Sequence, residues 1–159
     1  MNTPSALTLI KQPIHGLAFG FGSGLSPKAP GTMGTLMAIP LYLLLLELSP
    51  AGYLWAVVVS FIAGVYICHV SARDLGVHDH PGIVWDEFVG YWITMIAAPA
   101  GWLWIVIGFV LFRIFDIAKP WPISWCDKHV HGGFGIMIDD VLAGLMALGV
   151  MQLMAYWLI

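Results

Sequence analysis

The chain has 159 residues, of which 60% are hydrophobic and 9% are charged, and its mean hydropathy is +0.88. Because this composition is more apolar than that of ordinary soluble domains, it predicts a single membrane domain over residues 1–159. The net charge of -3 excludes a strongly basic surface, so no nucleic-acid partner is expected. The two cysteines, Cys68 and Cys126, indicate neither a disulfide framework nor a cysteine-based zinc site.

The N-terminal region carries its first positive charge at Lys11, after a short apolar run, which is the wrong order for a signal peptide. We therefore expect it to remain attached, on the cytoplasmic side. Residues 16–35 contain six glycines and read as a loop. Glycine lets backbone N–H groups approach an anion, but no G-K-[ST] follows, so the phosphate signal of this loop is weak by itself.

Apolar segments follow at residues 36–46, 53–70 and 138–159, with a polar loop at 121–135. Between them, residues 88–112 form a run of 25 uncharged residues, which is either one kinked span or two helices that turn back at residues 99–101. The turn places all six Lys and Arg residues on one side, as the positive-inside rule expects. We therefore predict an all-α polytopic bundle of about five apolar helices, with its C-terminus outside.

The strongest local signal is the run R-I-F-D-I-A-K at residues 113–119, at the end of a strongly apolar segment. Arg113, Asp116 and Lys119 recur every three residues, so on a helix they form one stripe. Charged groups at the edge of an apolar layer are costly unless they are paired or used. The stripe therefore indicates a site.

Acidic residues gather on the predicted cytoplasmic face. Clustered carboxylates repel one another unless a cation neutralises them, and hard oxygen ligands suit Mg2+. The alternative is that the pairs at helix starts are caps. The acids in question are Asp79, Asp86, Glu87, Asp116, Asp139 and Asp140.

Two rival functions fit parts of the pattern. Two H-x-H motifs, at His78 and His80 and at His129 and His131, could bind zinc together with carboxylates. Carboxylates within spans also occur in small ion- or proton-coupled transporters, although here the charges lie on one side only. A non-catalytic scaffold would need neither the glycine-rich loop nor the acids.

Four blocks of sequence resemble the phosphatidylglycerophosphatase A family. They are G-F-G-S-G-L-S-P-K-A-P-G-T-M-G-T, H-D-H-P-G-I-V-W-D-E-F-V-G, F-R-I-F-D-I-A-K-P-W-P-I and H-G-G-F-G-I-M-I-D-D-V-L-A-G, in this order across residues 15–149. The resemblance implies a Mg2+-dependent, multi-pass enzyme of the bacterial inner membrane. Such an enzyme hydrolyses the phospholipid phosphatidylglycerophosphate to phosphatidylglycerol and phosphate in phospholipid biosynthesis.

For a Mg2+-dependent phosphatase, the chemistry of the side chains divides the expected site residues into two groups. The nucleophile is either a metal-activated water or one of the acids. The expected catalytic and metal-binding residues are Asp86, Glu87, Asp116, Asp139 and Asp140. The expected phosphate-binding residues are Gly22, Ser23, Gly24, Lys28, Arg113 and Lys119. Arg113 has two possible roles: it grips the phosphoryl group, or it pairs with Asp116 as a structural ion pair.

Overall fold

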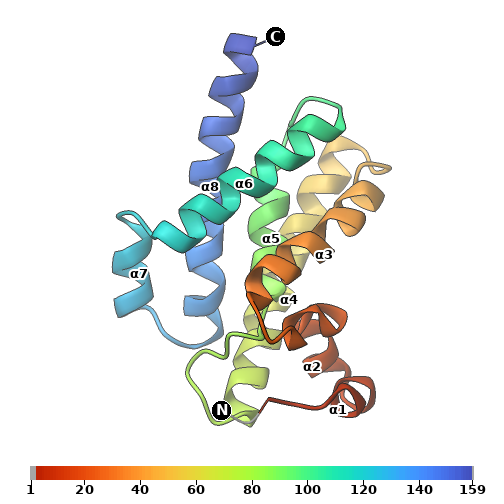
Figure 1. The fold of residues 1–159 in the computed structure, drawn as a ribbon, viewed down its shortest axis with the longest axis vertical. Coiled ribbons are helices and arrows are strands. Elements are labelled where there is room, and N and C mark those ends of the chain that lie inside the picture. Colours follow the sequence, from red (N-terminus) through yellow and green to blue (C-terminus); the bar gives the residue numbers. More distant parts are fainter. Residues whose placement is uncertain (1–2, 159) are drawn as a thin grey trace.

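The computed structural model describes residues 3–158, and all its regular elements are helical (Figure 1). Short helices occupy the N-terminal part and longer ones the remainder. The elements are α1 (Ala6–Lys11), α2 (Pro13–Ala18), η1 (Gly20–Leu25), α3 (Pro30–Leu45), α4 (Pro50–Asp74), α5 (Trp85–Thr94), α6 (Trp102–Ala118), α7 (Ile123–His129) and α8 (Gly132–Leu158).

The uncharged run of residues 88–112 is divided between two helices, α5 and α6, which confirms the predicted interruption. The connection between the two helices contains Pro99 and ends at Gly101, whose φ of 123° is a conformation that L side chains rarely adopt. In Figure 1 this connection lies toward the same end of the molecule as the C-terminus. The opposite end carries α7, α1 and α2.

Three sequence boundaries were wrong. The predicted loop at 16–35 contains η1 and already enters α3 at Pro30, because proline at the first helical position loses no hydrogen bond. The predicted loop at 121–135 contains the two-turn helix α7. The last helix begins at Gly132 rather than at 138, so its acids lie about two turns inside it.

The longest helix, α8, packs against α4, α5, α6 and α7 and forms the centre of the fold. Its approach to α5 depends on two glycines: a Cβ on Gly144 would overlap the carbonyl oxygen of Gly90, and a Cβ on Gly90 would lie 2.7 Å from the carbonyl oxygen of Asp140. On the other side of α5, the indole of Trp92 donates to the carbonyl of Ala38 in α3 at 3.1 Å. These contacts fix α5 between α3 and α8.

Two helices, α4 and α8, are long and apolar enough to cross a membrane, with mean hydropathies of 2.0 and 1.8 in their most apolar windows. By contrast, α5 has ten residues, about 15 Å of helix, which is half of a bilayer's hydrocarbon thickness. Large apolar side chains are nevertheless exposed along several helices, as at Ile62, Val110 and Leu153. An exposed apolar surface of this kind marks a membrane or partner surface.

Candidate active site

Three carboxylates from three helices meet at the polar end of the bundle. Glu87 comes from α5, Asp116 from α6 and Asp140 from α8, and one oxygen of each lies within 4.8 Å of the others. Within residues 3–158 this is the only such group of three His, Cys, Asp or Glu side chains. Residues separated by up to 53 positions are thus brought to one point by the packing of α5, α6 and α8.

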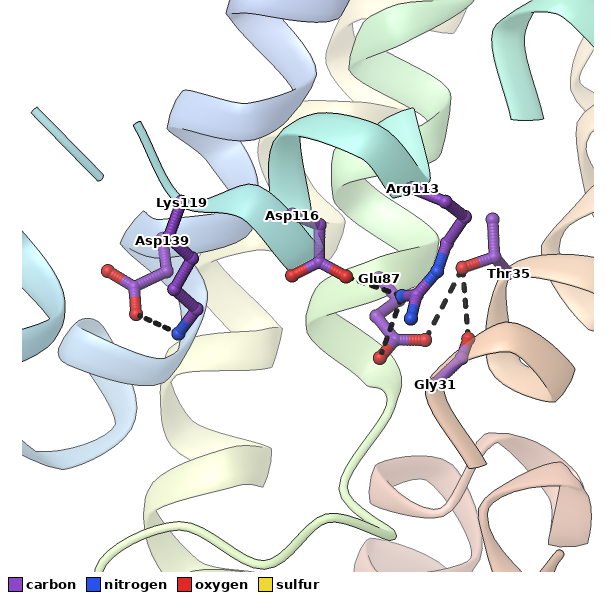
Figure 2. A network of polar contacts seen from close by, with 7 residues as sticks. All are labelled: Gly31, Thr35, Glu87, Arg113, Asp116, Lys119 and Asp139. Carbon is purple, nitrogen blue, oxygen red and sulfur yellow. Dashed lines mark hydrogen bonds and ion pairs between the residues drawn. The ribbon is translucent and has the colours of Figure 1, made fainter. Parts of the chain in front are cut away.

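Arg113 contacts two of these three acids, Glu87 and Asp116 (Figure 2). Its Nη1 forms an ion pair with Asp116 on the same helix and lies 3.5 Å from Oε1 of Glu87. The other oxygen of Glu87 accepts a 3.4 Å hydrogen bond from the hydroxyl of Thr35, which also donates to the carbonyl of Gly31. The structural pair that the helical spacing allowed is therefore formed, and Arg113 bridges α6 to α5.

The first turn of α3 lies directly against these groups. A Cβ on Gly31 would collide with the Glu87 carboxylate and lie 3.1 Å from Nη1 of Arg113. A Cβ on Gly34 would come within 2.8 Å of Oε2 of Glu87. The glycines of this turn therefore let the N-terminus of α3 reach the acids.

Lys119 belongs to a second polar cluster, on the other side of Asp116 from Arg113 (Figure 2). Its Nζ lies 2.6 Å from Asp127 of α7 and 3.4 Å from Asp139 of α8. Although burial opposes it, the hydrogen bond to Asp127 and the charge of Asp139 raise the pKa of Lys119, and Lys119 in turn lowers the pKa of Asp127. Lys119 thus joins the end of α6 to α7 and α8.

The acid group has the chemistry of a magnesium site. Its donors are all carboxylate oxygens, the ligands that Mg2+ prefers. Oδ2 of Asp140 and Oδ1 of the neighbouring acid Asp86 are buried without a hydrogen-bond partner in residues 3–158. Because a buried unpaired carboxylate oxygen is costly, these atoms fit a site that a cation completes.

The alternative that the acids are helix caps fails for one pair. Asp139 and Asp140 lie about two turns inside α8, where no free N–H groups remain to be capped. Asp86 and Glu87 do lie in the first turn of α5, although the capping position itself is Val84, which provides no side-chain hydrogen bond. Their place in the helix dipole is favourable, but it does not account for the convergence on Asp116.

The glycine-rich loop has a different arrangement from the expected phosphate cradle. The N–H groups of Gly22 and Gly24 both donate to the carbonyl of Phe19, and the hydroxyl of Ser23 donates to that of Gly20. Lys28 is exposed. Two of the expected backbone donors are therefore already used within η1, and the phosphate role of these residues stays a prediction.

The histidine motifs do not form a second group of three donors in the described part of the chain. One histidine of each motif contacts the other: Nε2 of His78 lies 2.9 Å from Nδ1 of His131. His80 accepts from the N–H of Gly82, and His129 contacts the carbonyl of Trp125. The zinc alternative thus has a pair of imidazoles but no third ligand beside it.

Sequence reasoning missed three residues of these clusters: Gly31, Thr35 and Asp127. The repeat G-T-M-G-T was read as loop, whereas on a helix Gly31 and Thr35 are one turn apart and share a face. Proline at position 30 is the signal that would have placed a helix start there. Asp127 carried no such signal, because only the fold brings α7 beside Lys119.

Comparison with known proteins adds to this geometry. Residues 16–155 match the family model described as phosphatidylglycerophosphatase A. The chain belongs to the phosphatidylglycerophosphatase A family. It is 53% identical to the phosphatidylglycerophosphatase A of Escherichia coli (strain K12) over 148 residues, which cover 92% of this chain and 86% of the relative. The Haemophilus influenzae phosphatidylglycerophosphatase A is 47% identical, with 99% of this chain and 98% of the relative covered.

Another similar protein, from Bacteroides thetaiotaomicron, is named a putative phosphatidylinositol-3-phosphatase; it is 40% identical and covers 100% of this chain and 99% of its own length. No solved structure matches. The chain is therefore an enzyme of the phosphatase class. Within the phosphatidylglycerophosphatase A family, the acids of α5, α6 and α8 are its candidate active site.

Proposed function

We propose that this member of the family hydrolyses phosphatidylglycerophosphate to phosphatidylglycerol and phosphate, as a step of phospholipid biosynthesis. The substrate is supported by the family match and by the names of the Escherichia coli and Haemophilus influenzae relatives described above. The observation that carries the reaction class is the convergence of Glu87, Asp116 and Asp140. Neither the fold nor the comparisons give any support to the alternative of an ion-coupled transporter.

The proposed cofactor is Mg2+, with Glu87, Asp116 and Asp140 as its ligands and Asp86 beside them. When bound, Mg2+ supplies Lewis-acid polarisation of the phosphoryl group and activation of a water. Thr35 holds one Glu87 oxygen in place, so the carboxylate is oriented before any ligand arrives. Asp139 and Lys119 hold α8 and α6 together at the edge of the site.

The proposed phosphate position lies between Arg113 and the first turn of α3. The helix starts after Ala29 without a side-chain cap, and the first N–H groups of a helix have no intrahelical partner. Together with the helix dipole, such groups favour an anion. Lys28 lies just before this turn and adds a positive charge to the approach. The anion site of this proposal is thus the start of α3, downstream of residues 22–24.

The proposed location is the bacterial inner membrane, with the site facing the cytoplasm. The apolar lengths of α4 and α8 and the exposed apolar side chains support a multi-pass arrangement. The acyl chains of the substrate would then remain beside the helices, while the headgroup phosphate reaches the polar end. The one-sided distribution of Lys and Arg supports the cytoplasmic orientation.

The test is phosphate release by the purified full chain in detergent micelles. We expect release from phosphatidylglycerophosphate with Mg2+, and its loss in EDTA with recovery when Mg2+ is restored. Phosphatidylinositol 3-phosphate serves as the comparison lipid, because a similar protein is named for it. Faster turnover of the inositol lipid would reject the proposed substrate, and full activity in EDTA would reject the metal.

A further inference from the structure

We infer that Arg113 acts as an internal stand-in for the metal: it neutralises the Glu87 and Asp116 carboxylates until Mg2+ binds, and is then released to contact the substrate phosphate. This inference rests on the proposed Mg2+ site. It gives Arg113 both roles that the sequence left open, in succession. The residue first serves as a counter-ion and afterwards as a clamp.

The geometry places the guanidinium and the metal in competition. Nη1 of Arg113 contacts both Glu87 and Asp116, and these are two of the three acids whose oxygens converge. When all three carboxylates are ionised, the guanidinium offsets one of their charges, whereas a divalent cation would offset two. A Mg2+ held by the same carboxylates would compete with the guanidinium for them.

The contacts of Arg113 also differ from those of a purely structural arginine. A structural Arg–carboxylate pair is often bidentate, with two parallel N–H···O bonds. Here both acidic contacts use the same atom, Nη1, while the buried Nε has no partner in residues 3–158. The guanidinium therefore holds unused donors, and planar donors of this kind match the oxygens of a phosphate.

The proposed phosphate position is close to the present position of the Arg113 guanidinium. Gly31, in the first turn of α3, lies against both Glu87 and Nη1 of Arg113 without a side chain between them. A guanidinium released from the acids would thus face the start of α3, where the proposed anion site lies. Mg2+ binding and phosphate binding are then coupled, because Mg2+ takes the carboxylates that Arg113 leaves and the phosphate takes the guanidinium that Mg2+ displaces.

The first test observes the arginine directly. The chain has two arginines, Arg73 and Arg113, so the side-chain 15N spectrum of the full chain in nanodiscs is simple, and Arg73→Gln assigns it. Addition of Mg2+ alone should shift the Arg113 Nε and Nη signals and leave those of Arg73 unchanged. Subsequent addition of inorganic phosphate should shift Arg113 again, and should do so weakly without Mg2+.

The second test measures Mg2+ affinity by calorimetry without substrate. Arg113→Gln removes the competing cation and should bind Mg2+ at least about tenfold more tightly than the wild type, while showing lower kcat/KM. Arg73→Gln, which removes an equal charge at an exposed ion pair with Asp74, should match the wild type within about twofold.

The two tests distinguish a failure of the inference about Arg113 from a failure of the proposed Mg2+ site. If wild-type protein binds no Mg2+, the proposed metal site is wrong and the inference falls with it. If Mg2+ binds but the Arg113 signals stay in place, the ion pair persists and only the inference is overturned. Equal Mg2+ affinity of wild type and Arg113→Gln would overturn it as well.

Discussion

Asp139 and Asp140 are neighbours in sequence with different surroundings. Successive residues on a helix point about 100° apart, so Asp139 faces Lys119 while Asp140 faces Glu87 and Asp116. A sequence pattern cannot separate two adjacent identical residues. The structure predicts that the two carboxylates contribute differently to catalysis.

Asp140→Asn should lower kcat/KM for phosphatidylglycerophosphate about 100-fold or more, because metal-ion stabilisation amounts to several kcal/mol and about 1.4 kcal/mol is a factor of ten. Its thermal midpoint in detergent should not fall, since Asn removes the charge of a buried side chain whose Oδ2 has no hydrogen-bond partner in residues 3–158. Asp139→Asn should lower kcat/KM less than tenfold and weaken the contact with Lys119. Equal losses in both variants would contradict the assignment.

The Lys119–Asp127 pair predicts a pH dependence of stability. The lowered pKa of Asp127 makes its contribution present above its unfolded pKa of about 3.9 and lost as the pH falls below it. The raised pKa of Lys119 makes its contribution complete below about 10.4 and lost at higher pH. The pair should therefore stabilise the protein evenly between about pH 5 and 9.

The contribution of the Lys119–Asp127 pair to stability is small because the Asp127 side chain is 43% exposed. Asp127→Asn should therefore lower the free energy of unfolding by at most about 1 kcal/mol at pH 7. Thermal unfolding in detergent from pH 3 to 9 measures this. The variant should lose less stability than the wild type on acidification. Parallel curves for the two proteins would show that the pair contributes nothing.

At the scale of elements, the site depends on how closely α5 approaches α8. Gly90 and Gly144 allow backbone contact between them, and this contact lies one turn from Glu87 and from Asp140 respectively. Small residues at such crossings let helices approach closely in membranes. Helix separation and carboxylate separation are therefore linked.

Gly144→Ala should push α8 from α5, because its Cβ would overlap the Gly90 carbonyl. We expect a loss of about 1–3 kcal/mol in stability, as for other overpacked positions, and a fall in kcat/KM. Gly149→Ala is the matched control: it lies on the same helix with no atom within 4 Å of the added Cβ, and should be neutral or stabilising by up to about 1 kcal/mol. Indistinguishable variants would argue against the close packing.

At the scale of the molecule, α7 and the N-terminal helices lie toward one end, and the α5–α6 connection lies toward the other (Figure 1). Large apolar side chains are exposed along α3, α4, α6 and α8, and also on α1, on η1 and around α7. Such a distribution fits a bilayer around the middle and water at both ends. It predicts which loops share a side.

Lys28→Cys, Arg73→Cys and Lys128→Cys should all be inaccessible to a membrane-impermeant thiol reagent on intact cells, and Ala100→Cys should be labelled. The background needs Cys68 and Cys126 replaced, since both are free thiols. Permeabilised cells provide the control for reactivity, and positions 28, 73, 100 and 128 are all exposed. Labelling at 128 but not at 100 would contradict the hairpin of α5 and α6 in the membrane.

The sequence alone determined the helical class and the acids worth testing, and it favoured the division of residues 88–112 without deciding it. These follow from composition, from Pro and Gly placement and from the rarity of charge, all of which are local properties. The spacing of Arg113 and Asp116 was also correct, because i,i+3 neighbours depend on a single helix. Lys119 was wrongly included in this stripe, because α6 ends at Ala118 and Lys119 has a left-handed backbone conformation.

Only the tertiary structure decided which partners these residues meet. The sequence placed Arg113 and Lys119 in one anion site, but α5 lies beside the first and α7 beside the second, so they belong to separate clusters. It likewise could not choose among five acids, because the convergence of Glu87, Asp116 and Asp140 depends on the packing of three helices. Contacts between distant segments are set by the shapes of the packed faces, which no local pattern contains.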